Sequence, residues 1–256
     1  MKNRVELSII IVNYQSADYL KKCIASIFDK TRDISFEIIV VNNSREAIDK
    51  VADIKIVDAE EDLGFGKGQN LGAKNAKGEI LWLLNADTEI LSRNTQGIVK
   101  EVKENGVVGP RLLNEDNSMQ SWSAGVEPTV WDLIRNNLGY PASQKVWESS
   151  KKREADWVSG ASLFIRKELF DKLGGFDENF FMYFEDIDLC RRIREAGYRV
   201  IYFPEFSVRH FGGKSFKDKK LQKKYFYQSQ DCYFKKHFGK FKSGLVKSLR
   251  KICIFK

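Results

Sequence analysis

The sequence predicts an α/β protein with an open, mostly parallel, Rossmann-like sheet and helices on both of its faces. Along residues 1–110, short β-branched runs alternate with helical patterns, which is typical of a parallel sheet covered by helices. The runs 9–12 (Ile-Ile-Ile-Val) and 38–41 (Ile-Ile-Val-Val) contain no polar residue, as expected when both faces of a strand are buried. The 256 residues, 43% of them hydrophobic, suit one large folded domain with an appendage.

Hydrophobic periodicity and turn residues place the expected elements in order along the chain. In the first half we expect strands over 7–12, 36–41, 54–57 and 79–84, and helices over 18–28 and 67–76. After Gly109-Pro110 the alternation stops, and an irregular stretch follows that is rich in aromatic and small polar residues. Order returns with strands over 157–165 and 198–203 and with helices over 167–173 and 185–196, the last ended by Gly197.

Polar residues follow three of the expected strands at the point where each strand ends. They are 13–16 (Asn-Tyr-Gln-Ser), 42–44 (Asn-Asn-Ser) and 85–88 (Asn-Ala-Asp-Thr). Open α/β sheets bind their ligands at the carboxyl ends of the strands. The sequence therefore predicts a ligand site at this edge of the sheet.

Charge is distributed unevenly along the chain. Of 43 Lys and Arg and 35 Asp and Glu, 15 basic residues and only two acids lie from Arg209 onward. We expect residues 214–256 to form a basic, amphipathic helical tail, which either packs on the body or lies on an anionic membrane surface. A nucleic-acid-binding protein would spread positive charge over its folded face, so we expect no nucleic acid partner.

Cysteine usage and hydropathy bear on the compartment. The four cysteines, Cys23, Cys190, Cys232 and Cys253, form no CxxC pair, and the chain has only two histidines, so we expect a reducing compartment and no structural zinc. No apolar run reaches the roughly 18 residues of a membrane span. The run 7–12 is too short for the core of a signal peptide. These features predict a cytoplasmic protein.

Asp87 directly follows a strand that we expect to be buried. A carboxylate in this place could hold Mg²⁺ or Mn²⁺, which proteins bind through one or two carboxylates plus substrate phosphates. Alternatively, Asp87 closes a turn or caps a helix that begins near Leu91. The motif alone leaves both interpretations open.

Glycines crowd the segment 62–72 (Asp-Leu-Gly-Phe-Gly-Lys-Gly-Gln-Asn-Leu-Gly) before the second expected helix. Glycine lets backbone amides approach a phosphate, and a helix N-terminus favours anions. The spacing matches neither a P-loop nor a dinucleotide fingerprint, so a plain flexible loop is the alternative.

Five large apolar residues, 180–184, run directly into the carboxylates Glu185, Asp186 and Asp188. This juxtaposition can place a carboxylate at a partly desolvated wall, as a general base requires. Acids in the first turn and arginines in the last turn also suit a purely structural helix. His210 precedes two glycines and could bind metal or phosphate, although a lone histidine is more often structural.

Taken in order, seven motifs resemble those of the family 2 inverting glycosyltransferases of GT-A fold, and bacterial rhamnosyltransferase-like members in particular. They are VNYQS, VVNNS, DLGFGKGQNLG, LLNADT, WVSGASLFIRKELF, GGFDENFFMYFEDIDLCRRIREAG and VRHFGG. The resemblance implies a GT-A domain over residues 1–213, with a nucleotide-sugar-binding half (1–110) and an acceptor and catalytic half (111–213), before the tail 214–256.

The resemblance also implies roles for single residues. Asp87 is similar to the last acid of the DxD motif and His210 to an additional ligand of a divalent cation, Mg²⁺ or Mn²⁺, whereas Asn85 stands at the first DxD position. Asp186 is similar to the catalytic base, with Glu185 beside it. The implied nucleotide-binding residues are Val12, Asn13, Tyr14, Asn42, Asn43, Ser44, Gly64, Phe65, Gly68, Asn70, Asn85 and Ala86. The implied acceptor residues are Trp157 and Gly160.

The implied activity is that of an inverting, metal-dependent hexosyltransferase in polysaccharide and cell-wall biosynthesis. The expected donor is a nucleoside diphosphate sugar, dTDP-L-rhamnose by likeness, and the expected acceptor is a hydroxyl of a lipid-linked or growing polysaccharide. A lipid-linked acceptor would place the protein at the inner face of the plasma membrane. A non-catalytic partner subunit with this fold and a nucleotidyltransferase remain as alternatives.

Overall fold

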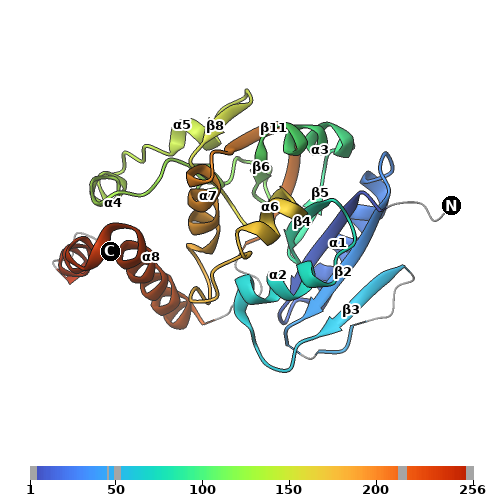
Figure 1. Ribbon diagram of the computed structural model, residues 1–256, viewed down its shortest axis with the longest axis horizontal. Helices are drawn as coiled ribbons and strands as arrows, with labels where there is room; N and C mark the ends of the chain where they lie inside the picture. The colour runs from blue at the N-terminus through green and yellow to red at the C-terminus, as the bar shows by residue number, and fades with distance from the viewer. Residues whose placement is uncertain (1–4, 45, 49–52, 213–217, 252–256) are drawn as a thin grey trace.

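The computed structural model describes residues 5–44, 46–48, 53–212 and 218–251, and the expectations for Gly213 and for both ends of the tail lie outside these ranges. Within them, nine strands form one sheet in the order β3-β2-β1-β4-β10-β6-β11-β5, with β8 paired to β11 (Figure 1). None of the described helices combines the length and apolar character needed to span a bilayer. The α/β fold class expected from the sequence is confirmed.

The N-terminal half follows the predicted order closely. Its strands β1, β2, β3 and β4 pair in parallel, as their unbroken apolar runs predict. Its elements are β1 (Leu7–Asn13), α1 (Ala17–Lys30), β2 (Phe36–Asn42), β3 (Ile54–Asp58), α2 (Gly64–Lys74) and β4 (Ile80–Asn85).

The second half is mixed, because β10 inserts antiparallel between β4 and β6 whereas β6 and β11 run parallel. Its elements are β5 (Thr88–Ile90), α3 (Thr95–Glu104), β6 (Gly106–Leu113), β7 (Ala124–Gly125), α4 (Val130–Asn137), α5 (Gln144–Trp147), β8 (Arg153–Ala155), β9 (Trp157–Val158), β10 (Ser162–Arg166), α6 (Lys167–Lys172), α7 (Glu185–Glu195), β11 (Arg199–His210) and α8 (Lys219–Lys251).

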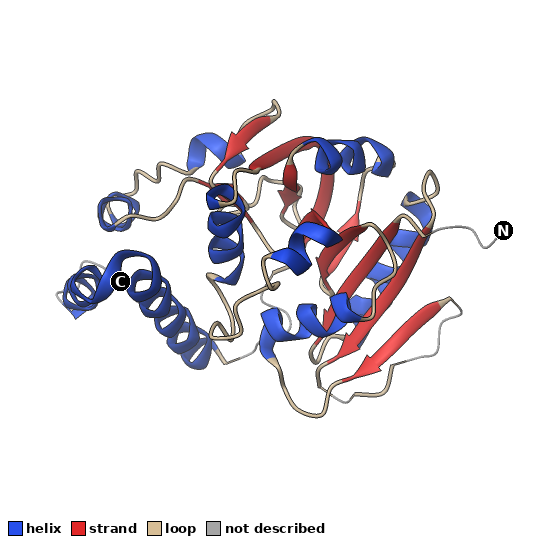
Figure 2. Cartoon of the chain, viewed as in Figure 1, coloured by secondary structure: helices blue, strands red, loops and turns tan. Residues whose placement is uncertain are grey.

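Helices cover both faces of the sheet, as predicted (Figure 2). On one face, α1 and α3 bury Ile24, Ile27 and Val102 against the strands. On the other face, a second apolar cluster joins α2, α6 and α7 to the sheet through residues such as Phe170 and Leu189. Each helix contributes one apolar side, as expected for helices that pack on a buried sheet.

Two predicted strands have different bounds in the structure, and both differences shape the site. The strand expected over 157–165 is divided into β9 and β10 by a turn at residues 159–161. The strand expected to end at 203 continues as β11 to His210 through a register shift between Phe203 and Ser207. Such a bulge redirects a strand without ending it.

The basic tail folds as α8, which is interrupted at Gly239 by a non-helical backbone conformation. Tyr233, Phe234 and Val246 pack with Phe184 and Leu133 in a third apolar cluster that joins α8 to the body. In Figure 1, α8 lies at the end of the molecule opposite β3, with α7 between α8 and the sheet. The tail is therefore held to the catalytic half by a core of its own.

Candidate active site

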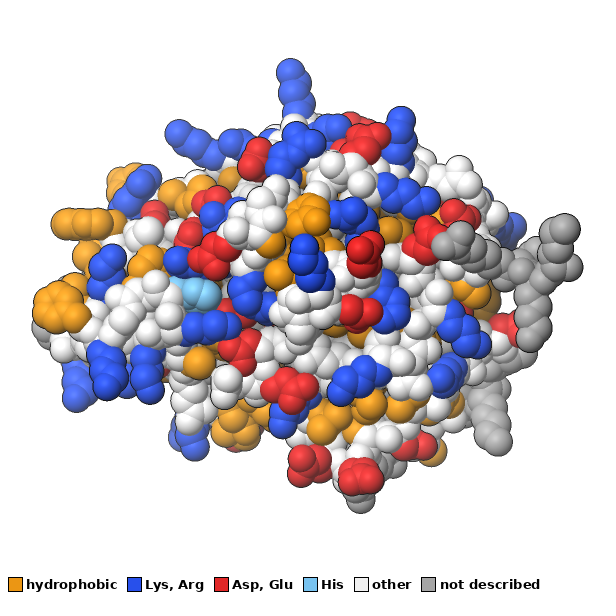
Figure 3. All heavy atoms as spheres, viewed as in Figure 1, with side chains coloured by type: hydrophobic (Ala, Val, Ile, Leu, Met, Phe, Trp, Pro, Cys, Tyr) orange, Lys and Arg blue, Asp and Glu red, His pale blue; other side chains and the backbone are white. Residues whose placement is uncertain are grey.

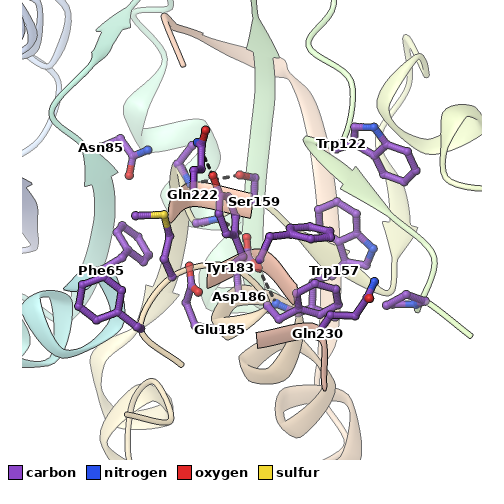
Figure 4. A pocket seen from close by; sticks show the side chains of 18 of the residues that line it. Phe65, Asn85, Trp122, Trp157, Ser159, Tyr183, Glu185, Asp186, Gln222 and Gln230 are labelled. Atoms are coloured by element: carbon purple, nitrogen blue, oxygen red, sulfur yellow. Dashed lines mark hydrogen bonds between the residues drawn. The ribbon is translucent and has the colours of Figure 1, made fainter. Parts of the chain in front are cut away.

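A cavity of about 740 Å³ lies at the carboxyl ends of β1 and β4 and extends to α7 and α8. Asp87, His210 and Asp186 all line it. In the view of Figure 4, Asn85 and Phe65 lie on one side, Trp122, Trp157 and Gln230 on the other, and Glu185 and Asp186 between them. The structure thus brings the three proposed catalytic and metal-binding side chains into one space.

Asp87 lies in the two-residue turn between β4 and β5, only 3% exposed. It caps no helix, because α3 begins at Thr95 with Asn94 as its cap. The last residue of β11, His210, pairs with Thr88 of β5, and this pairing brings the imidazole Nε2 to 3.3 Å from Asp87 Oδ1. The amide nitrogen of Asn85 lies 3.1 Å from the same Nε2. The extended β11 is therefore what joins His210 to the turn that follows β4.

Gln120 orients the His210 ring. Its side-chain amide group donates to Asn114 Oδ1 and to the backbone oxygen of His210, both at 3.1 Å. These two bonds leave Gln120 Oε1 facing His210 Nδ1 at 2.7 Å. An amide oxygen in this place accepts a hydrogen bond from Nδ1–H, and in that tautomer the lone pair lies on Nε2, the atom that faces Asp87.

The donor atoms present suit a divalent cation. Adjacent ligands of an octahedral ion with bonds of about 2.1 Å lie about 3.0 Å apart, close to the separation of Asp87 Oδ1 and His210 Nε2. No third His, Cys, Asp or Glu completes a metal-binding cluster within the described ranges. Two protein ligands are enough for a cation that takes its remaining ligands from water and from phosphate oxygens.

Asp186 lies in the first turn of α7 with both carboxylate oxygens held by backbone amides. Gly160 N donates to Oδ2 at 2.9 Å, and Ile187 N donates to Oδ1 at 2.8 Å. The turn that divides β9 from β10 is what presents the Gly160 amide. Just before α7, Tyr183 and Phe184 both have positive φ, at 69° and 65°, a strained conformation for side chains of this size.

Glu185 and Asp186 differ in how their charge is stabilised. Burial, followed by the charge of Asp186, raises the pKa of Glu185 well above its ordinary value, and its Oε2 has no hydrogen-bond partner. Burial also raises the pKa of Asp186, but its backbone amide donors oppose that shift. Of the two groups, Asp186 is therefore the one whose negative charge is stabilised by donors from both Gly160 and Ile187.

The implied nucleotide-binding residues divide into two groups. Seven line the cavity: Val12, Tyr14, Asn43, Gly64, Phe65, Asn85 and Ala86. The side chains of Asn13, Asn42 and Asn70 bond within the protein, to Glu46, to Asp58 and to the backbone of Phe176. Ser44 Oγ accepts from Gln15 N, and Gly68 packs on Val12. Nucleotide contact by the second group stays a prediction. Both implied acceptor residues, Trp157 and Gly160, line the cavity.

The glycine-rich segment is helical from Gly64 onward, not a loop before the helix. A Cβ atom at Gly68 would lie 2.9 Å from Val12 Cγ2, and one at Gly72 would lie 2.2 Å from Ile10 Cγ2. These glycines let α2 approach β1 closely. Of the segment, only its start, at Asp62, Gly64 and Phe65, lines the cavity.

The cavity is acidic. No Lys or Arg is among the described residues that line it, although the chain carries a net charge of +8. Its five carboxyl groups belong to Asp62, Asp87, Asp132, Glu185 and Asp186. A diphosphate that enters this space gains no Lys or Arg side chain from these residues.

Sequence reasoning did not identify Gln120 or the cavity-lining face of α8 as part of the site. Gln120 lies with Trp122 in the irregular, aromatic-rich stretch, and α8 was expected only to pack on the body or to lie on a membrane. A positive φ of 61° at Trp122 is visible only in the structure. For α8, the spacing of Gln222, Phe226 and Gln230 by four residues was a signal of a shared helix face.

Comparisons with known proteins show which family the chain resembles. Residues 8–174 match the family model described as glycosyl transferase family 2, and residues 143–212 match a model described as the N-terminal domain of galactosyltransferase. The chain is similar to the low-salt glycan biosynthesis hexosyltransferase Agl10 of Haloferax volcanii, with 24% identity over 76% of this chain and 64% of the relative. It is also similar to the N-acetylglucosaminyl-diphospho-decaprenol L-rhamnosyltransferase of Mycobacterium tuberculosis, with 23% identity over 80% of this chain and 75% of the relative.

Among solved structures, GalNAc-T7 with UDP, GalNAc and Mn²⁺ superposes with a TM-score of 0.64 and 20% identity. The match covers 82% of this chain and 44% of that chain, and it concerns the fold. The family model spans well over half of the present sequence and includes β1 to β4 with Asp87. The chain belongs to glycosyl transferase family 2.

Proposed function

We propose that this protein is an inverting, metal-dependent glycosyltransferase that moves a sugar from a nucleoside diphosphate to a hydroxyl group of a lipid-linked or growing polysaccharide acceptor. The observation that carries the proposal is that Asp87, His210 and Asp186 line one cavity at the carboxyl ends of the strands. The proposed donor is dTDP-L-rhamnose, which is supported by the likeness to the mycobacterial L-rhamnosyltransferase.

On the donor side, the first half of the chain, residues 1–110, would bind the nucleotide. Tyr14, Asn43 and Phe65 line the cavity there, and the Asn43 amide is held by Asp62 Oδ1 at 2.9 Å. Asp87 and His210 would hold Mg²⁺ or Mn²⁺, which would neutralise the charge that develops on the diphosphate as it leaves. The absence of Lys and Arg from the described lining supports this dependence on a cation.

On the acceptor side, Asp186 would accept the proton of the attacking hydroxyl group. General base catalysis by a positioned carboxylate contributes typically about 10²–10⁴-fold to a rate. Its amide donors Gly160 N and Ile187 N fix the direction of the carboxylate, and burial keeps the pKa of the neighbouring Glu185 well above its ordinary value. Attack on the face opposite the leaving diphosphate inverts the anomeric carbon without a covalent intermediate, unlike the double displacement of retaining glycosidases.

Contact with an anionic membrane is a further part of the proposal. Beyond Gly239, Phe241 and Leu245 are exposed on α8, and Lys240, Lys242 and Lys247 lie between and beside them. On the face shown in Figure 3, Lys and Arg side chains border hydrophobic ones at the end of the molecule where α8 lies. Flotation with phosphatidylglycerol liposomes, compared with neutral liposomes and with Phe241→Ala, tests this contact.

The experiment for the activity is a donor screen. Wild-type protein is incubated with dTDP-rhamnose, UDP-sugars or GDP-mannose and Mn²⁺, with and without EDTA, and the nucleoside diphosphate released is measured by mass spectrometry. We expect release from dTDP-rhamnose that EDTA and Asp87→Ala both abolish. Release that is unaffected by EDTA would overturn the metal assignment, and no consumption of any donor would overturn the proposed function.

A further inference from the structure

One face of α8 forms a wall of the active-site cavity. Gln222, Phe226, Tyr227 and Gln230 all line it, although they lie beyond the segments that either family model matches. Gln222, Phe226 and Gln230 are spaced by four residues and lie on one side of a helix, and Tyr227 lies beside Phe226. The cavity that contains Asp186 is therefore completed by the C-terminal helix.

Hydrogen bonds and ion pairs fix this wall to α7 and to the residues just before α7, so the contacts lie on both sides of Asp186 in the sequence. Before it, Ser229 Oγ donates to Met182 O at 2.7 Å, and the side-chain amide of Gln222 donates to Tyr183 Oη. After it, Lys236 Nζ and His237 Nε2 lie 2.6 and 2.7 Å from Oδ1 of the buried Asp188. These contacts of α8 with residues on both sides of Asp186 therefore fix the position of α8 relative to the proposed base.

The surface that α8 completes is aromatic and amide-rich. Phe226 on α8 is 38% exposed, and Trp122, which lines the same cavity, is 47% exposed. Trp147 packs on Trp122 with ring centroids 5.0 Å apart and so supports one side of that ring. The positive φ of Trp122 is strain that the surrounding structure maintains, which is common at ligand sites.

The chemistry of this surface selects its occupant. Gln222, Gln230 and Asn136 place side-chain amides in the lining, where Gln222 donates to Tyr183 Oη and Gln230 Oε1 accepts from Arg250. Arg250 also lies over the Tyr227 ring but, like the other Lys and Arg residues that the structure describes, does not itself line the cavity. Exposed aromatic faces and amides suit a ring that has apolar C–H faces and hydroxyl edges.

We propose that α8 and Trp122 form the acceptor subsite, and that its occupant is a neutral sugar ring of the acceptor rather than the acceptor's phosphate. This inference rests on the proposed function and names the part of the acceptor that the site recognises. It assigns a role in acceptor specificity to Phe226 and Trp122, which lie outside the seven motifs that resemble those of the family.

The test measures the KM for the acceptor in Phe226→Ala, Trp122→Ala and wild-type protein. The probes are octyl hexosides, each with and without a diphosphate between the sugar and the octyl chain. We expect wild-type protein to use a neutral octyl hexoside, and each variant to raise its KM about tenfold, with a smaller change in the KM for the donor. Phe226→Trp, which keeps an aromatic face, should restore the KM, and Gln228→Ala, an exposed residue of the same helix outside the cavity, should leave it unchanged.

Two results would overturn the inference while the proposed function stands. One is an acceptor KM in both alanine variants that equals the wild-type value. The other is transfer only to acceptors that carry the diphosphate, or hydrolysis of the donor with transfer to no neutral hexoside. A wild-type protein that consumes no nucleotide sugar would instead contradict the proposed function itself. Circular dichroism melting curves of each variant show whether the fold is retained.

Discussion

Replacing Asp188 with alanine should weaken the attachment of α8 to α7. Asp188 is wholly buried, and its carboxylate accepts from Lys236 and His237 on α8 and from Arg192 Nε at 2.8 Å. Removal of one partner from a buried ion pair costs about 3–5 kcal/mol, because the remaining charges stay buried without compensation.

The surrounding contacts place the expected loss at the lower end of that range. Lys236 keeps Asp177 at 2.7 Å, and Arg192 keeps the backbone oxygens of Leu173 and Gly175 at 2.9 Å. We therefore expect a loss of about 3 kcal/mol in the free energy of unfolding, which lowers Tm by about 6–12 °C in a chain of this size.

The assay is urea unfolding followed by circular dichroism, with Asp171→Ala as the matched control. Asp171 also pairs with a lysine, Lys167 at 2.6 Å, but its side chain is 55% exposed, and exposed pairs of this kind contribute only about 0–1 kcal/mol. A loss in Asp188→Ala no larger than that in Asp171→Ala would refute the reasoning that this cluster attaches α8.

Three further predictions concern the site and its support. The free energy of unfolding of Glu185→Gln, relative to wild type, should rise with pH. Because the pKa of Glu185 is raised, the folded wild-type protein binds more protons than the unfolded chain and loses stability as the pH increases above the unfolded value of 4.5. Parallel curves of unfolding free energy against pH for the two proteins would contradict this. Gln120→Leu removes the acceptor at His210 Nδ1 and should weaken Mn²⁺ binding about 10–100-fold in electron paramagnetic resonance titrations, whereas an unchanged affinity would leave Gln120 without this role. Gly72→Ala places a methyl group 2.2 Å from Ile10 and should cost about 1–3 kcal/mol in chemical denaturation, whereas Gly244→Ala, with no atom within 4 Å, should cost nothing; equal effects would show that α2 tolerates a larger distance from β1.

The parallel half of the fold could be predicted because its signals are local. The apolar runs at 9–12 and 38–41 mark buried strands without any knowledge of their neighbours. In contrast, β6 contains Gly109-Pro110, a pair of residues that predicts the end of a strand. The structure accommodates the proline because β10 pairs with β6 only at Val107 and Val108, so the ladder with β10 does not need a backbone N–H at Pro110.

Parts of the site were predictable for the same reason. Asp87 and Asp186 follow recognisable apolar segments, and both line the cavity. The length of β11 was not predictable, because Pro204 lies within it and the register shift that carries it past this point depends on pairing with β6. The lining face of α8 could not be assigned either, since helix spacing shows that Gln222 and Phe226 share a side but not what that side meets. Tertiary contacts decide these features.

The central claim is that Asp186 removes the acceptor proton while Asp87 and His210 hold the donor's cation in the same cavity. Single-turnover transfer from dTDP-rhamnose in the presence of Mn²⁺ by Asp186→Asn tests it most directly. We expect a rate about 10²–10⁴-fold below that of wild-type protein, together with donor affinity that is retained in a calorimetric titration. A wild-type rate in Asp186→Asn would contradict the account.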